Sequence, residues 1–68
     1  MYARTVVVTE YERGWGSRVL DTLYFSNDEK AIRYRNEVNA KNTAPVAPDW
    51  YIAAELGDVV NAPDELVR

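Results

Sequence analysis

The chain has 68 residues, a net charge of −3 and an isoelectric point near 4.7, and it contains neither cysteine nor histidine. This composition excludes disulfides and thiol nucleophiles, and it removes the usual zinc ligands and the commonest general base. No apolar run approaches the ~20 residues that span a membrane, and the first residues show a strand pattern rather than a signal peptide. We therefore expect one cytoplasmic domain over residues 1–68, without a membrane partner.

The charge is unevenly distributed along the chain. Residues 1–41 carry seven basic and six acidic side chains, whereas residues 42–68 carry one basic and five acidic side chains. Because phosphate contacts dominate affinity for duplex DNA, the acidic second part argues against duplex nucleic acid as the main partner. A small acidic protein is instead suited to a basic surface on another protein.

Residues 2–11 predict a β-strand, because β-branched side chains dominate the segment. Even positions place Val6 and Val8 on one face, and odd positions place Val7 and Tyr11 on the other. A strand that is apolar on both faces is usually central in its sheet.

Residues 12–18, ERGWGSR, predict a hairpin loop, because glycines on either side of Trp15 permit positive φ angles. Residues 18–25 predict the returning strand. Its alternation of apolar and polar side chains is broken, and a β-bulge would explain the irregularity.

Residues 26–42 form the one long segment with a helical pattern. Ser26 and Glu29 match a capping box at its start. The apolar stripe is narrow, so the helix needs a sheet to pack on; it consists of Ala31, Tyr34 and Val38.

Residues 50–56 predict a third strand from their clear alternation, with Trp50 as the main aromatic side chain of the core. Gly57 and Asp58 then predict a turn, so residues 57–68 are expected to form an acidic C-terminal tail.

The element order predicts an α+β fold of the ββαβ type. A right-handed crossover through the helix makes strand three parallel to strand two, with strand one between them. The result is a three-stranded antiparallel sheet of order 2-1-3 with one helix packed on one face. The other face needs a cover, and a homodimer is the preferred solution; the alternative is a monomer whose tail folds over that face.

The hairpin carries the candidate partner-binding residues. Tryptophan, tyrosine and arginine are the residue types most enriched at binding hot spots. In one alternative, Trp15 folds back over the sheet edge and closes the small core. In another, Trp15 stacks on a base of a single-stranded nucleic acid while Arg13 and Arg18 bind its phosphates. The expected partner-binding residues are Tyr11, Arg13, Trp15, Arg18 and Tyr51.

A catalytic arrangement has weaker support in the sequence. Glu10, Glu12 and Asp21 could approach one another across the hairpin, and carboxylates alone can perform acid–base catalysis. Solvated charges at a sheet edge are the commoner outcome. Gly14-Trp15-Gly16 lacks the third glycine of a dinucleotide site. We therefore expect no enzyme activity, no catalytic residue, no cofactor and no metal.

The ERGWGSR hairpin, the helix with Asn39 and Asn42, and the PDWY run at residues 48–51 together resemble small uncharacterised proteins carried by bacteriophages and prophages. The resemblance implies a short accessory protein that binds a host factor. The expected function is a non-enzymatic, phage-encoded protein that inhibits or modulates a host protein in the host cytoplasm, during host takeover or against host defence. The alternative is a small-ligand or nucleotide-binding module with sites between copies of an oligomer.

Overall fold

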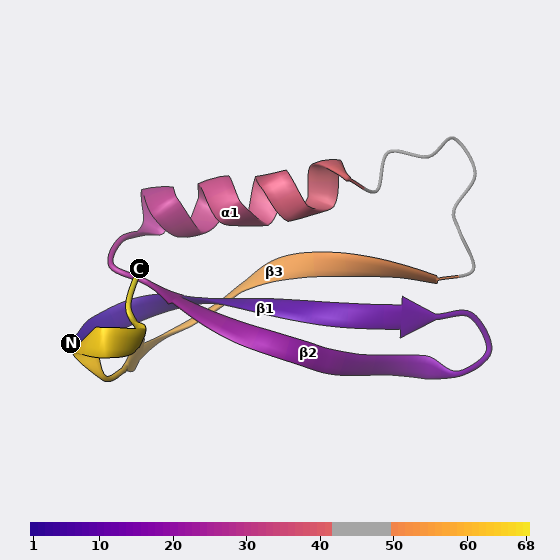
Figure 1. Ribbon diagram of the computed structural model, residues 1–68, viewed down its shortest axis with the longest axis horizontal. Coiled ribbons are helices and arrows are strands. Elements are labelled where there is room, and N and C mark those ends of the chain that lie inside the picture. Colours follow the sequence, from indigo (N-terminus) through magenta and orange to yellow (C-terminus); the bar gives the residue numbers. More distant parts are fainter. Residues whose placement is uncertain (42–49) are drawn as a thin grey trace.

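The computed structural model describes residues 1–41 and 50–68, so the proline-containing connector and Asn42 lie outside the described residues. Three strands, one α-helix and a short 3₁₀ turn make up the described chain (Figure 1). In chain order they are β1 (Tyr2–Glu12), β2 (Gly16–Phe25), α1 (Asp28–Ala40), β3 (Trp50–Asn61) and η1 (Asp64–Leu66).

The strands form one antiparallel sheet of order β2-β1-β3. The helix α1 lies along one face of this sheet and packs mainly against β3 (Figure 1). The predicted α+β fold, sheet order and single helical layer are therefore confirmed. The central place of β1 follows from its valines, because a strand with apolar side chains on both faces gains most from neighbours on both sides.

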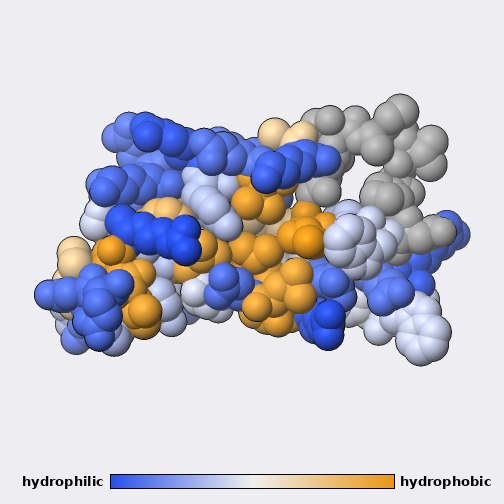
Figure 2. All heavy atoms as spheres, viewed as in Figure 1, coloured by the Kyte–Doolittle hydropathy of each residue, from blue (hydrophilic) through white to orange (hydrophobic). Residues whose placement is uncertain are grey.

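The core is a thin apolar layer between α1 and the sheet. Figure 2 shows apolar side chains gathered in this layer and polar side chains over the outer surface of the helix. The ring of Phe25 packs against that of Tyr34 with centroids 5.3 Å apart. Burial of each valine, leucine or phenylalanine contributes roughly 1.5–3 kcal/mol. The buried cluster consists of Val6, Val8, Leu23, Phe25, Ala31 and Ala54.

The helix start differs from the predicted capping box. Asn27, not Ser26, is the N-cap, and its side-chain oxygen accepts a hydrogen bond from the Lys30 N–H at 2.9 Å. The backbone N–H of Ser26 instead donates to the carbonyl of Arg68 at 2.9 Å. Serine and asparagine are both good caps, so the contact with the C-terminus selects between the two neighbours.

Arg4 joins three elements at the start of the helix. Its Nε donates to Asp28 Oδ1 at 2.9 Å, and its Nη1 donates to the carbonyl of Gly57 at 3.0 Å. The side chain thereby links β1, α1 and β3. The hydrogen bond from Arg4 holds the pKa of Asp28 below its usual value.

Two irregularities shape the sheet. The register of β1 and β2 shifts between Val8 and Thr9, which confirms the predicted bulge in the returning strand. The predicted turn after residue 56 is wrong, because β3 continues to Asn61. The Thr5 hydroxyl donates to the Asp58 carbonyl at 2.8 Å where the β1–β3 register shifts. Gly57 and Asp58 therefore form an irregularity within β3 rather than a turn, and the tail begins only at Ala62.

The helix also protects the free edge of β3. The side-chain amide of Asn39 donates to the Ala54 carbonyl at 3.0 Å, and its oxygen accepts from the Ala54 N–H at 2.8 Å. One asparagine therefore occupies both backbone groups that an added strand would use at this position.

The C-terminal tail is tied to the end of the sheet. The Arg68 N–H donates to the Tyr24 carbonyl at 2.8 Å, and the Ala62 N–H donates to the Met1 carbonyl at 2.8 Å. Leu66 nevertheless stays 52% exposed. The tail thus closes the end where β1 begins and β2 ends (Figure 1).

Candidate binding surface at the hairpin tip

The turn between β1 and β2 presents Trp15 to solvent. The backbone N–H of Trp15 donates to the Glu12 carbonyl at 3.0 Å and closes a tight turn. Gly14 and Gly16 have φ angles of 82° and 89°, a conformation that favours glycine. The Trp15 side chain is 83% exposed and lies outside the buried cluster, so the alternative in which it closes the core is wrong.

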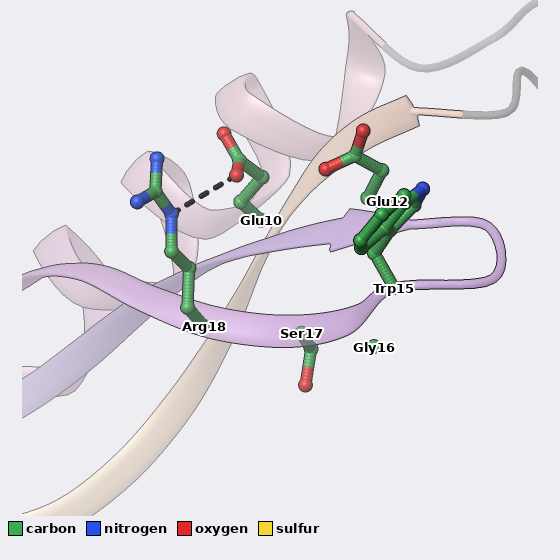
Figure 3. A pocket seen from close by; sticks show the side chains of 6 residues that line it. All are labelled: Glu10, Glu12, Trp15, Gly16, Ser17 and Arg18. Atoms are coloured by element: carbon green, nitrogen blue, oxygen red, sulfur yellow. Dashed lines mark hydrogen bonds and ion pairs between the residues drawn. The ribbon is translucent and has the colours of Figure 1, made fainter.

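The hairpin has two chemically different faces near its tip. In Figure 3, Glu10, Glu12 and Arg18 project to the same side of the hairpin as the indole of Trp15. Ser17 projects to the opposite side (Figure 3). The paired registers of β1 and β2 explain this arrangement, because Glu10 pairs with Arg18 directly across the ladder.

The predicted tyrosines lie on the Ser17 side. Tyr11 pairs with Ser17 on β2 and with Tyr51 on β3, so these side chains share one face. The rings of Tyr11 and Tyr51 are stacked, with centroids 5.1 Å apart and planes 16° from parallel. The structure therefore divides the predicted binding residues: Trp15 and Arg18 lie on the helix side, and the two tyrosines lie on the open sheet face.

The helix side of the tip is hollowed into an open pocket of about 280 Å³. Arg18 Nε donates to Glu10 Oε1 at 3.0 Å, and the Glu10 side chain is only 16% exposed. Arg18 is therefore engaged with a carboxylate, rather than free as the phosphate-binding alternative requires. The pocket is lined by Glu10, Glu12, Trp15, Gly16, Ser17 and Arg18.

Glu10 and Glu12 are pocket residues that the predicted binding set does not include. The signal that could have found them is the hairpin register, which places alternate residues of β1 opposite Gly16 and Arg18. Within residues 1–41 and 50–68, the carboxylate of Glu12 makes no hydrogen bond or ion pair. Arg13 lies in the same turn but does not line the pocket, and it has a partner of its own.

Two of the three carboxylates considered for catalysis have separate partners. Glu10 binds Arg18, and the Asp21 carboxylate accepts the Thr22 N–H at 2.8 Å. In the described part of the chain, no group of three or more acidic, histidine or cysteine side chains is arranged to hold a metal ion.

A second concavity of about 400 Å³ lies between α1 and the sheet. Trp50 contributes to its wall and stays 50% exposed, so its predicted place as the main aromatic of the core is wrong. Phe25 fills that role, because it lies under the first turns of the helix and Trp50 lies beside its last residues. The lining residues are Val8, Tyr34, Val38, Lys41, Trp50 and Ile52.

Comparisons with family models, with curated proteins and with solved structures find no match to this chain. No helix in residues 1–41 and 50–68 is long and apolar enough to cross a membrane. The fold and the tip together define a small α+β domain with an exposed tryptophan on a hairpin.

Proposed function

We propose that the protein is a non-enzymatic binding protein whose hairpin tip docks on another protein. The observation that carries the proposal is the 83% exposure of Trp15 at the tip of a closed turn. A large aromatic side chain outside the core adds little to folding, whereas its burial against a partner removes extensive apolar surface from water. Tryptophan is also among the residues that most often dominate binding energy.

The scaffold is suited to presenting this side chain. The ladder between β1 and β2 extends to the pair Glu12–Gly16, so only three residues separate the two strands at the tip. Tryptophan has two side-chain torsions, and a short paired turn restricts the backbone before binding. Little conformational entropy is then lost when the tip meets its partner.

The same surroundings disfavour a nucleic acid at this tip. A phosphate near the Trp15 indole would face the carboxylates of Glu10 and Glu12, and Arg18 already binds one of them. Base stacking on an exposed aromatic ring gains affinity when basic groups hold the backbone. A protein surface therefore fits the charge of the tip better than a single strand does.

The resemblance to phage-carried accessory proteins supports a partner in the host cell. In this proposal the protein acts in the cytoplasm as an inhibitor or modulator of a host protein, with Trp15 at the centre of the contact. Tyr11 and Tyr51 form a second aromatic surface on the open sheet face. In this proposal that face meets a second copy of the chain.

Affinity capture from bacterial lysate tests the proposal. The immobilised wild-type chain should retain a defined protein, and Trp15→Ala should lose it while its melting temperature stays within a few degrees. Tyr2→Ala is the matched control, because Tyr2 is 73% exposed at the other end of β1. Equal capture by wild type, Trp15→Ala and Tyr2→Ala would refute a binding role for the tip.

A second candidate function, small-ligand binding, is favoured by the concavity beneath the helix. Its lining is mainly apolar, and Lys41 supplies one cation at the helix end. This lining suits an aromatic anion. Titration with anilinonaphthalene sulfonate tests it: saturable binding should weaken in Lys41→Gln, which removes the cation without changing the core, and binding that is equal in both chains would refute the site.

A further inference from the structure

The charges around the tip pocket do not cancel. Its lining includes two carboxylates, Glu10 and Glu12, and one guanidinium, Arg18. Glu10 and Arg18 form an ion pair at 3.0 Å, so the remaining negative charge belongs to Glu12. Since Glu12 has no partner in residues 1–41 and 50–68, its carboxylate is available to an incoming cation.

The exposed indole lies beside this carboxylate. Figure 3 shows Trp15 and Glu12 next to each other at the mouth of the turn, with both side chains on the helix side of the hairpin. A cation placed over an indole face is attracted by the negative charge of the π system. A carboxylate next to the ring adds a hydrogen-bond acceptor and an opposite charge for the same group.

We propose that this pocket binds a cationic side chain, an arginine or lysine, of the partner protein. The cation lies against the indole of Trp15 and donates to the carboxylate of Glu12. The inference rests on the proposed function and deepens it by assigning the chemistry of the group that the tip recognises. Arginine fits best, because its planar guanidinium stacks on an aromatic face and donates to a carboxylate at the same time.

The ion pair behind the pocket gives the site its selectivity. Arg18 neutralises Glu10 and fixes its carboxylate, so the pocket has a defined acceptor in Glu12 rather than a diffuse acidic surface. An anionic group would meet Glu12 without compensation. A neutral polar group would gain neither the cation–π attraction nor the charge-assisted hydrogen bond.

Nuclear magnetic resonance with two matched peptides tests the assignment. The probes are acetyl-Gly-Arg-Gly-amide and its citrulline counterpart, which has nearly the same shape without the charge. The full chain has two tryptophans, and the Trp15→Phe variant assigns their indole N–H signals. The arginine peptide should shift the Trp15 signal in a saturable, salt-sensitive manner, and the citrulline peptide should leave it unchanged.

Variants separate the two contacts. Glu12→Gln, followed by the Trp15 indole signal, and Trp15→Leu, followed by the backbone N–H signals of the turn, should each weaken arginine binding by about two- to fivefold, the range expected for one exposed cation–π or ion-pair contact. Glu65→Gln removes the same charge from the exposed tail at the other end of the molecule and should leave binding unchanged. Equal weakening by Glu65→Gln would show a general charge effect and overturn the site.

The outcomes also distinguish this inference from the proposed function. Equal binding of the arginine and citrulline peptides, or a shift by a short oligothymidylate instead, would overturn cation recognition. The lysate capture that depends on Trp15 would then still stand. Loss of that dependence would refute the proposed function whatever the peptides show.

Discussion

Asn39 should contribute far more to stability than its exposed place on a polar helix suggests. Its side chain makes two hydrogen bonds, at 3.0 and 2.8 Å, to the carbonyl and N–H of Ala54, which is only 2% exposed. Asn39→Ala removes both bonds and leaves these backbone groups without partners. Each lost bond costs about 1 kcal/mol, and each unsatisfied buried group costs more, about 1–3 kcal/mol.

The replacement also has a favourable term. Alanine is the better helix former by about 0.5 kcal/mol. Because Asn39 itself is exposed, water can reach the groups it leaves, so the lower end of the cost for the two groups applies and the net loss for Asn39→Ala is about 2–3 kcal/mol. In a domain of this size 1 kcal/mol corresponds to roughly 4–8 °C, so the melting temperature should fall by about 10–20 °C. Thermal and urea unfolding followed by circular dichroism measure both quantities.

Asn36→Ala provides the control on the same helix. Asn36 Oδ1 accepts from Arg35 at 3.0 and 3.1 Å, and both bonds are exposed. Asn36→Ala brings the same gain in helix propensity, and it removes no hydrogen bond to a buried backbone group. The free energy of unfolding should therefore stay within about 0.5 kcal/mol of wild type. If Asn39→Ala and Asn36→Ala behave alike, the contact between α1 and the edge of β3 does not stabilise the fold.

Three further predictions follow from the packing, the electrostatics and the open sheet face. Gly57→Ala places a methyl group against the Thr5 hydroxyl and should displace its bond to the Asp58 carbonyl, lowering the melting temperature by several degrees; unchanged stability would show that the strand shifts freely. The pKa of Asp28 is lowered by Arg4, so its stabilising effect is present above the ordinary carboxyl pKa and is lost as the pH falls through the lowered value. Asp28→Asn should therefore destabilise the chain at neutral pH and flatten its acid unfolding; an unchanged pH profile contradicts the ion pair. Light scattering at micromolar concentration should give the mass of a homodimer, packed through the open sheet face or along an edge strand, and the mass of one chain, unchanged on dilution or concentration, would contradict it.

The sheet order was predictable because it depends on patterns that many residues share. The valines of β1 require a central position, and the crossover through a helix has one preferred hand. The narrow stripe of Ala31, Tyr34 and Val38 likewise faces the core as its spacing predicts. Such patterns survive local irregularities because no single residue decides them.

The errors concern places where one tertiary contact decides between similar local choices. The alternation of apolar and polar residues in β3 placed Trp50 on the helix side of the sheet. It could not show that Trp50 lies beside the end of the helix, where the helix covers the sheet only in part and the side chain stays exposed. The glycine at position 57 signalled a turn, yet pairing with β1 keeps it in the strand. The two hydrogen bonds that join Arg68 to Tyr24 and to Ser26 link backbone groups, which leave no signature in a sequence.

The candidate site was predictable in its residue types and only partly in its geometry. Two glycines around Trp15 indicated an exposed tip, and the side chain is exposed. The division between the pocket side and the tyrosine side depends on the hairpin register, which a broken alternation in β2 obscured. The role of Arg18 changed for the same reason, because the register places it opposite Glu10.

Photocrosslinking from the hairpin tip tests the central claim most directly. Benzoylphenylalanine replaces Arg13, two residues before Trp15 in the turn, in one variant and Tyr2 in another, so that both variants keep Trp15, and each is irradiated in bacterial lysate. If the tip is the binding surface, a discrete crosslinked protein should form from position 13 and be absent from position 2, where the side chain is also exposed. The absence of a product from position 13, or the same products from both positions, would contradict the account.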